Sequence, residues 1–333
     1  MNYSKGNKII ASLGVALIFM PYIFMLIGVT FHIATEILIY SIFAIGFNIL
    51  LGYTGIVSFG HAAFFGVGAY ILGFTQIYLT PSAWISISLG VVAAGIVSVG
   101  ICYLIIKKHG IYFALLTMAL GQIFYFMVYR FTEITGGENG LSGIKPPIVN
   151  ILGIELNFAN SVYFYYLVLL IFVIEMLIIW RFINSPFGKV IQGIKENENR
   201  MKYLGYNTQK YRVIAFVLSA TFSGLAGSLY AIHLRFAFPQ LLHWTTSGDV
   251  VMIALIGGLK NFFGPILGAA IFILSKDIIS SFTDRWMIIM GSIFIFFVIL
   301  SPEGILGLFE KGKKKSLKEF LKSFKRYRLG KNA

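Results

Sequence analysis

Residues 84–106 read WISISLGVVAAGIVSVGICYLII, a run that contains no charged side chain. A helix needs about 20 mostly apolar residues to cross a bilayer, because in hydrocarbon every backbone N–H and C=O must be bonded within the helix itself. Comparable runs lie on both sides of it, at residues 9–29, 33–51, 56–79, 111–130, 161–180, 213–234, 249–259, 262–279 and 286–300. The sequence therefore predicts an all-α, polytopic membrane helix bundle of about ten transmembrane segments.

The number of full crossings depends on the pair of runs at residues 249–259 and 262–279. The first run is short, and a glycine-rich and proline-containing stretch that includes Gly257, Gly264 and Pro265 follows it. Half-spans occur where protein or a water-filled cavity receives their exposed backbone groups. A broken or re-entrant pair here would reduce the number of spans to about eight or nine.

Composition excludes a water-soluble fold. The 333 residues are 58% hydrophobic and only 12% charged, against about 25% charged in soluble domains. Cys102 is the single cysteine, so neither a disulfide framework nor a cysteine-based metal cluster can form. We interpret residues 9–29 as a retained first helix, because the run exceeds the roughly 7–15 apolar residues of a signal peptide.

Positive charge gathers in the gaps that ten crossings would place on one side of the membrane. Most of the 27 Lys and Arg residues lie there, at Lys5, Lys8, Lys107, Lys108, Lys260, residues 181–212 and the tail after residue 301. An excess of Lys and Arg in short loops marks the cytoplasmic side, so both termini are predicted to be cytoplasmic. Because these charges alternate with apolar spans, the net charge of +14 reflects topology, and nucleic acid is not expected as a partner.

Signatures of enzymes are missing from the sequence. It holds no Gly-x-x-x-x-Gly-Lys-Ser/Thr phosphate loop, no His-Glu-x-x-His and no Gly-x-Ser-x-Gly elbow. We therefore predict no catalytic residue, no metal site and no cofactor bound by this chain. If the protein transports a solute with the help of ATP, another chain must bind that ATP.

Residues 52–70, GYTGIVSFGHAAFFGVGAY, carry the strongest internal pattern. Ser58, Ala62 and Gly66 are spaced four apart, which predicts one helix face where small residues let two helices approach closely. The same pattern recurs at Ser219, Ser223, Gly227 and Ala231, and at Gly264 and Gly268.

His61 is the most polar residue of that stretch, and two interpretations of it stay open. Polar groups inside membranes often line a translocation path, but a histidine can also bond a neighbouring helix and fix packing. The same two interpretations apply to Asn48, Ser58, Thr117 and Gln122. Glu36, Asp249 and Asp277 lie near expected span ends, and Glu175 lies near Arg181, so no proton relay is indicated.

Residues 181–212 form the one long polar loop expected on the cytoplasmic side before the tail. Ser185 can cap a helix that begins at Pro186, and Gly205 can end another. An amphipathic helix between them would place on its apolar face Val190, Ile191, Ile194, Met201 and Leu204. Such a helix can dock onto a partner or serve as an ordinary connector.

The domain division follows from these segments. Residues 1–307 are predicted to form the transmembrane domain, with residues 181–212 as a cytoplasmic loop within it, and residues 308–333 a basic tail. The tail either lies on the anionic inner leaflet or is solvated.

Several motifs in the same order resemble one family. They are residues 52–70, GIYFA (110–114), TGGENGLSGI (135–144), SPFGKVIQGIKENENRMKYLG (185–205), AFVLSA (215–220), GG (257–258) with FGPILGA (263–269), and SPEG (301–304). The chain resembles LivM, the permease subunit of branched-chain amino acid ABC importers, within the wider group of LivH, LivM and ribose-type permeases. The resemblance covers most of the chain, from about residue 38 to residue 307.

The resemblance implies a partner set: a LivH-like second permease, two cytoplasmic ATP-binding subunits and an external or periplasmic substrate-binding protein, around a multi-pass protein of the bacterial cytoplasmic membrane. It also implies that the loop is a coupling helix for the ATPase. The expected loop residues are Pro186, Gly188, Lys195, Glu196, Asn197, Glu198 and Gly205. In the usual Glu-Ala-Ala-x-x-x-Gly pattern the glycine corresponds to Gly205, whereas Arg200 and Met201 replace the alanine pair.

The function implied by the resemblance is translocation of Leu, Ile and Val by alternating access, driven by separate ATPase subunits. LivM-like permeases also serve urea, amides and other amino acids, so these substrates remain alternatives. A stand-alone secondary transporter is a further alternative, although it would need an ion-coupling site of its own, for which His61 and Glu175 are the candidates.

Overall fold

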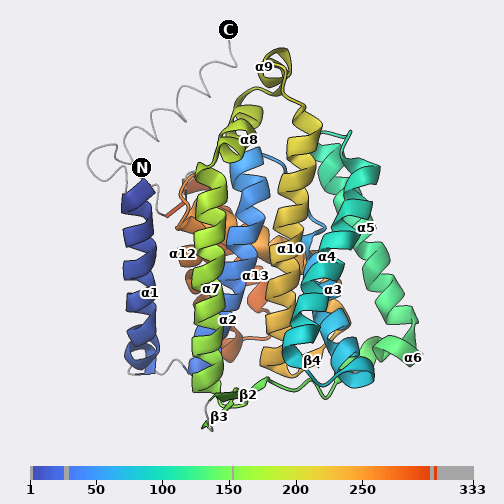
Figure 1. Ribbon diagram of the computed structural model, residues 1–333, viewed down its shortest axis with the longest axis vertical. Coiled ribbons are helices and arrows are strands. Elements are labelled where there is room, and N and C mark those ends of the chain that lie inside the picture. Colours follow the sequence, from blue (N-terminus) through green and yellow to red (C-terminus); the bar gives the residue numbers. More distant parts are fainter. Residues whose placement is uncertain (1–2, 26–29, 152–153, 301–303, 306–333) are drawn as a thin grey trace.

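The computed structural model describes residues 3–25, 30–151, 154–300 and 304–305, and in this part the apolar runs fold into helices that lie side by side (Figure 1). The long elements are α1 (Tyr3–Met25), α2 (Phe31–Asn48), α3 (His61–Phe74), α4 (Ala83–Ile105), α5 (Gly110–Arg130), α7 (Ser161–Asn184), α10 (Thr208–Leu234), α11 (Trp244–Gly257), α12 (Gly264–Phe282) and α13 (Trp286–Leu300). Single π-helical segments extend α2 and α3, namely η1 (Ile49–Thr54) and η2 (Thr75–Leu79).

Seven helices of the described chain are long and apolar enough to cross a membrane: Phe31–Thr54, His61–Leu79, Ala83–Ile105, Gly110–Arg130, Ser161–Asn184, Thr208–Leu234 and Gly264–Phe282. Shorter apolar helices cover Ser12–Tyr22, Trp244–Gly257 and Trp286–Phe297. The predicted all-α, multi-pass architecture is therefore confirmed, but ten full crossings are not shown.

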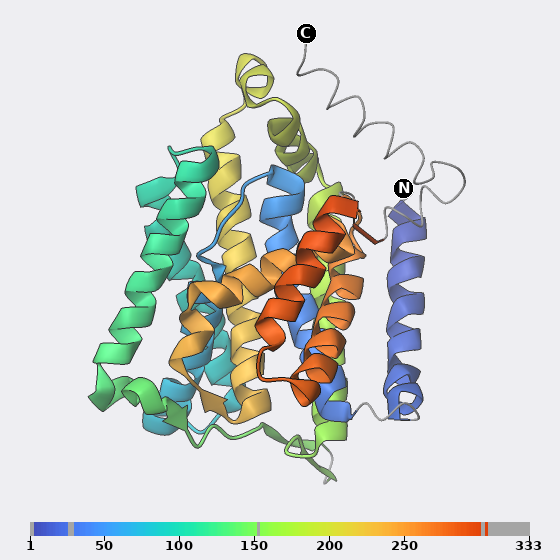
Figure 2. The ribbon, with the colours of Figure 1, turned by 180° about the vertical axis from the view of Figure 1, so that it is seen from behind.

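Helix α11 is the reason why the pair at residues 249–279 is irregular. Its 14 residues span roughly 21 Å at 1.5 Å per residue, less than the about 30 Å of a bilayer core. It runs obliquely across the other helices, and α12 returns beside it (Figure 2). A Cβ on Gly268 of α12 would overlap the carbonyl oxygen of Ile253, so the two backbones are in contact. This matches the close approach predicted at Gly264 and Gly268.

The predicted helix at residues 56–79 begins later than expected. Residues 55–60 are not helical, and α3 starts at His61. Gly55 ends η1 in the left-handed region at φ 73°, and the Ser58 hydroxyl accepts a hydrogen bond from the Gly60 N–H at 3.3 Å. The prediction that Ser58 shares a helix face with Ala62 and Gly66 is therefore wrong, because local side-chain and glycine geometry outcompetes helix continuation.

Helix α10 packs against α2, α3 and α4 and so forms the centre of the bundle. A Cβ on Gly227 would overlap the carbonyl oxygen of Phe65, and one on Gly68 would overlap that of Gly224. These glycines let α3 and α10 approach to backbone contact, as small residues do between helices in lipid. Gly66 instead faces the side chain of Leu242 in η4 (Pro239–Leu242), not another long helix.

The two ends of the bundle differ. One end carries α8 (Pro186–Glu196) and α9 (Glu198–Tyr203), and α1 begins and α13 ends towards it (Figures 1 and 2). Lys260 acts electrostatically on Lys195 of α8, so the loop between α11 and α12 lies there too. The expected cytoplasmic basic segments that the structure describes thus share one end, here called the α8/α9 end, while residues 308–333 lie outside the described part.

The opposite end is closed by short β-ladders. Strand β1 (Leu141–Ser142) pairs antiparallel with β4 (Phe236–Ala237), and β2 (Ile148–Ile151) pairs with β3 (Ile154–Asn157). The loop before β1 contains α6 (Thr132–Thr135) and η3 (Gly137–Asn139). These elements anchor the predicted external loop of residues 131–160 to the end of α10.

Candidate functional site

His61 lies at the first position of α3, in the interior of the bundle, with no exposed surface. Its Nδ1 is 2.9 Å from the Ser58 hydroxyl, and its Nε2 is 2.9 Å from the hydroxyl of Ser219 on α10. Three aromatic rings pack edge-to-face with the imidazole, namely Phe47, Phe64 and Phe216. Both ring nitrogens are therefore satisfied, and the side chain ties the start of α3 to α10.

Two further hydroxyls hold the same junction. The N–H of Ala62 donates to the Ser247 hydroxyl on α11 at 2.8 Å, and the N–H of Phe59 donates to the Thr117 hydroxyl on α5 at 3.1 Å. Thr117 in turn donates to the carbonyl of Ala114 at 2.7 Å. The non-helical segment 55–60 and the start of α3 are thus bonded to helices α5, α10 and α11.

Some polar groups in the interior lack partners in the part of the chain that the structure describes. They include Oδ1 of Asn48, Nε2 of Gln122 and both carboxyl oxygens of Glu175, which is 1% exposed. A Cβ on Gly52 would overlap the Asn48 amide and lie 2.9 Å from the carbonyl oxygen of Leu259, so a larger residue there would displace the Asn48 side chain. The structure brings Ser58, His61, Ala62 and Thr117 together at the start of α3, whereas Asn48 is buried against Gly52 in η1. Whether solute passes beside any of them remains a prediction.

The segment of residues 185–205 forms two helices instead of one. Ser185 accepts from the Gly188 N–H at 3.2 Å and Pro186 is the first residue of α8, as predicted. Asn197 breaks the helix with extended backbone, and its Oδ1 accepts from the Arg200 N–H at 2.9 Å to cap α9. Because an Asn side chain makes this cap only outside a helix, a single amphipathic helix does not form.

The apolar face of α8 and α9 is mostly buried, since Val190, Ile191, Ile194 and Met201 are each at most 9% exposed. Leu204 is 65% exposed, so it does not share one apolar face with these four residues, as a single amphipathic helix would have required. It follows the end of α9, where the chain turns towards Gly205 at φ 87°. The α8/α9 segment is therefore seated on the bundle by one face and presents other apolar residues outward.

Lys195 links α8 to the end of η1. Its Nζ donates to the carbonyl of Gly52 at 2.5 Å. Burial and the nearby charge of Lys260 lower the pKa of the Lys195 ammonium. The neighbouring Glu196 is exposed.

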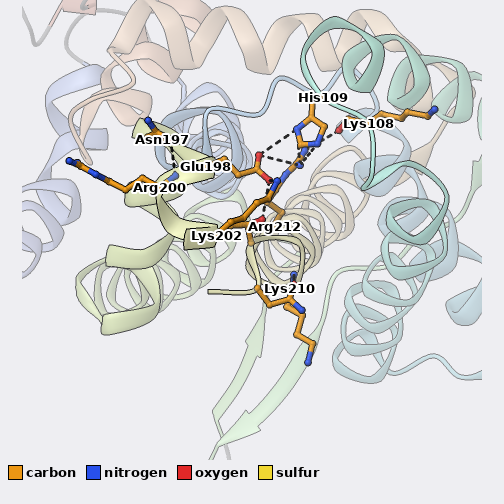
Figure 3. Close-up of polar contacts among 10 residues, drawn as sticks. Lys108, His109, Asn197, Glu198, Arg200, Lys202, Lys210 and Arg212 are labelled. Carbon is orange, nitrogen blue, oxygen red and sulfur yellow. Dashed lines mark hydrogen bonds and ion pairs between the residues drawn. The ribbon is translucent and has the colours of Figure 1, made fainter. Parts of the chain in front are cut away.

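A cluster of charges around Glu198 holds α9 in place (Figure 3). The carboxylate lies 3.0 Å from the Lys202 ammonium, 3.5 Å from Nδ1 of His109 and 3.8 Å from the Arg212 guanidinium. The Thr208 hydroxyl donates to the same carboxylate at 3.0 Å. Four partners from three segments therefore converge on one side chain.

Arg212 connects this cluster to the loop between α4 and α5. Its guanidinium, 3% exposed, donates to the carbonyl of Lys108 at 3.1 Å and lies 3.1 Å from the His109 ring. Burial raises the pKa of the Glu198 carboxyl, but hydrogen bonds from Lys202 and Thr208 and the charges of Arg212 and Lys202 outweigh it, so the pKa ends below its usual value. Glu198 therefore stays ionised at neutral pH.

A cavity of about 500 Å³ opens beside this cluster. Its walls come from the non-helical segment, the start of α5 and the α8/α9 segment, and its lining residues are Thr54, Gly55, Ile56, Val57, Phe59, His109, Gly110, Ile111, Ala114, Ile194, Lys195, Glu198 and Arg212. The cavity thus reaches from the charged α8/α9 end to Phe59 near the start of α3, and Ser58, His61 and Thr117 are not among its lining residues. Within the described ranges no group of three or more His, Cys, Asp or Glu side chains could hold a metal ion.

Sequence reasoning missed His109, Thr208 and Arg212 as partners of Glu198, and Ser247 as a partner of the α3 start. One signal was available for Arg212, since an arginine at the start of a long apolar helix needs a partner or solvent. The other contacts join residues far apart in the chain, for example residues 109 and 212. Such pairs cannot be read from a single sequence.

The fold and the site together define a class: a multi-pass membrane protein with a polar interior and a charged, anchored segment at one end. The family described as branched-chain amino acid transport system, permease component, matches residues 29–299. The chain belongs to this family of ABC transporter permease subunits, which are transport proteins and not enzymes.

Individual relatives agree with the family. The chain is 28% identical over 302 residues to the high-affinity branched-chain amino acid transport system permease protein LivM of Escherichia coli K12, covering 85% of this chain and 71% of that protein. The probable LivM of Methanocaldococcus jannaschii is 24% identical over 319 residues, covering 80% and 90%. The LivH permease of Salmonella typhimurium LT2 is 22% identical over 286 residues, covering 80% and 91%. No solved structure matches the chain.

Proposed function

We propose that this chain is the LivM-like permease subunit of an ABC importer that carries branched-chain amino acids across the bacterial cytoplasmic membrane. Family membership and the likeness to LivM proteins support this proposal. The proposed assembly contains a LivH-like second permease, two cytoplasmic ATP-binding subunits and an external substrate-binding protein. ATP is bound by those partner subunits.

The orientation follows from charge. Lys107, Lys108, Lys260 and the basic residues of α8 and α9 lie at one end of the bundle. Short loops rich in Lys and Arg stay on the cytoplasmic side, so the α8/α9 end is assigned to the cytoplasm. Residues 1–307 then form the permease domain, with 181–212 as its coupling loop and 308–333 as a cytoplasmic basic tail.

The proposed coupling role rests on one observation. The α8/α9 segment is fixed to the bundle on one face and exposes apolar side chains on another. Ion pairs to Glu198 hold α9, while Tyr203 is 91% exposed, Leu204 is 65% exposed and Glu196 faces solvent. Exposed apolar side chains with a polar rim mark protein interaction sites. We infer that Tyr203 and Leu204 enter a groove on the ATP-binding subunit, and that Pro186, Gly188 and Gly205 shape the segment.

Movement of that segment would then alter the cavity beside it. Alternating access needs two states that differ in their affinity for solute or nucleotide-bound partners. In this proposal ATP-driven closure of the partner subunits shifts α8 and α9, and the polar region with Asn48, Ser58, His61, Ala62, Gly66, Thr117 and Gln122 faces one side and then the other. The lining role of these residues is part of the proposal.

The test is reconstitution into liposomes with the partner subunits, the binding protein, ATP and radiolabelled leucine. We expect ATP-dependent uptake from the full assembly and none from the chain alone. Accumulation by the chain alone would instead identify the alternative, a secondary transporter. The double variant Tyr203→Ser and Leu204→Ser should lose ATPase co-purification while the protein remains inserted, and an unchanged complex would contradict the docking role.

The substrate is tested separately. Competition of leucine uptake by isoleucine, valine, urea and short amides, with each candidate binding protein, distinguishes a branched-chain system from the related urea and amide systems. Inhibition by isoleucine and valine alone is the expected result.

A further inference from the structure

A second hollow lies at the α8/α9 end, on the outer surface between the end of α4 and the start of α10. Its volume is about 670 Å³. The residues that line it are Tyr103, Leu104, Ile106, Lys107, Asn207, Gln209, Lys210, Val213 and Ile214. We call it the α4/α10 groove, and it is separate from the cavity beside Glu198, with which it shares no lining residue.

The α4/α10 groove has a basic, polar upper half. Lys107 follows the last residue of α4 by two positions, and Lys210 is the third residue of α10. Both side chains are exposed, and neither ammonium has an acidic partner in the part of the chain that the structure describes. Figure 3 shows Lys210 pointing away from Glu198, whose charge is already met by other groups.

The lower half of the α4/α10 groove is apolar and open. Tyr103 is 84% exposed, Leu104 is 67% exposed and Ile214 is 48% exposed. These residues belong to the last turn of α4 and the second turn of α10, inside the membrane-spanning helices. Apolar side chains at that depth contact lipid tails, while lysines at the helix ends reach the headgroup layer.

Basic side chains at the helix ends with apolar side chains deeper in the membrane are complementary to an anionic phospholipid. A phospholipid presents a phosphodiester anion at the level of helix ends and apolar chains below it, and basic pockets between membrane helices bind anionic headgroups. No carboxylate lines the groove to repel a phosphate. We propose that the α4/α10 groove binds one anionic phospholipid, with its phosphate between Lys107 and Lys210 and an acyl chain along Leu104 and Ile214.

The position of the lipid gives it a structural effect. Asn207 caps α10 by accepting from the Lys210 N–H at 3.2 Å, and the next residue, Thr208, donates to Glu198. A lipid phosphate held by Lys210 therefore stabilises the same first turn of α10 that anchors α9. This inference requires only that the chain spans a membrane, and it is independent of the transported solute.

Native mass spectrometry of the full-length protein with added phosphatidylglycerol or phosphatidylcholine tests the proposal. We expect one tightly retained phosphatidylglycerol. The double variant Lys107→Gln and Lys210→Gln should weaken its retention roughly 25-fold, because each lysine near an anionic surface contributes about a fivefold gain in affinity. The charge-preserving double variant Lys107→Arg and Lys210→Arg should retain the lipid.

The matched control is the double variant Lys189→Gln and Arg200→Gln, which removes two exposed charges of α8 and α9 outside the groove. It should bind phosphatidylglycerol as the parent does. Equal binding by the groove variant and this control would overturn the proposal. So would a groove variant that binds lipid normally but no longer co-purifies with the ATP-binding subunits, since a protein would then occupy the groove. If the double Gln variant does not insert, the single variants Lys107→Gln and Lys210→Gln give the same decision, because each should weaken phosphatidylglycerol retention roughly fivefold.

Discussion

The Glu198 cluster makes a quantitative prediction about how firmly α9 is held. In Glu198→Ala, the Thr208 hydroxyl and the Lys202 ammonium each lose a partner at 3.0 Å, and the 3%-exposed Arg212 loses its nearest carboxylate. A hydrogen bond to a charged group contributes about 1.5–3 kcal/mol, whereas the half-exposed Lys202 pair contributes less than about 1 kcal/mol. Allowing for the buried guanidinium, the anchoring of α9 should weaken by about 3 kcal/mol.

A loss of that size is measurable by amide hydrogen exchange. About 3 kcal/mol corresponds to a roughly 100-fold change in the equilibrium between seated and detached α9. Peptides covering residues 197–207 should exchange correspondingly faster in Glu198→Ala, while peptides from the centre of α10 should not change. Glu196→Ala is the matched control, because Glu196 is also acidic and near the same turn but exposed.

The two variants should separate in function as well as in exchange. If Glu196 contributes to a partner surface, its loss weakens ATPase binding without loosening α9. Faster exchange in both variants, or in neither, would refute the assignment of Glu198 as the intramolecular anchor. Retained protection in Glu198→Ala would show that the apolar contact of Met201 alone seats α9.

Three further predictions follow from the described contacts. Gly227→Ala should lower the apparent melting temperature by several degrees, because the new Cβ would overlap the backbone of α3 and overpacking costs about 1–3 kcal/mol; Gly291→Ala, which meets nothing within 4 Å, should not. Ser219→Ala should cost about 1–3 kcal/mol by leaving Nε2 of His61 unpaired, as measured by thermal unfolding in detergent. Because the folded pKa of Glu198 is lowered, its contribution is complete above the unfolded value of about 4.5 and is lost as pH falls through the folded value; the protection of α9 amides, corrected for the intrinsic exchange rate at each pH, should fall in that acid range.

The sequence was most informative where a property depends on neighbouring residues. Apolar runs located the long helices, and Ser185 with Pro186 located the start of α8, because span length and capping are local. The break before His61 was missed, since residues 56–79 contain no proline and no Asp, Glu, Lys or Arg, and helical spacing alone does not reveal that Gly55 adopts positive φ.

Contacts between distant segments set the rest of the candidate site. Leu204 was grouped with Met201 on one apolar face by its spacing, but α9 ends at Tyr203, so Leu204 lies beyond the helix and is exposed. The partners of Glu198 come from residues 109, 202, 208 and 212, of which only residue 202 has a helical spacing to it. Long-range pairing of this kind depends on the fold as a whole.

Helix α10 joins the two features of the candidate site in one rigid element. Its first turns bind α9 through Thr208 and Arg212, and its centre binds the start of α3 through Ser219. Between these points no proline or helix break interrupts α10, and close-packed helices transmit displacement instead of absorbing it. In the proposed mechanism, we expect a displacement of α9 by a bound partner to reach His61 and the non-helical segment 55–60 along α10. Segment 55–60 and the start of α3 are held to α5 and α11 through the hydroxyls of Thr117 and Ser247, whereas α3 meets α10 in direct backbone contact at Gly227. We therefore propose segment 55–60 as the place where motion of α10 would change the shape of the polar interior.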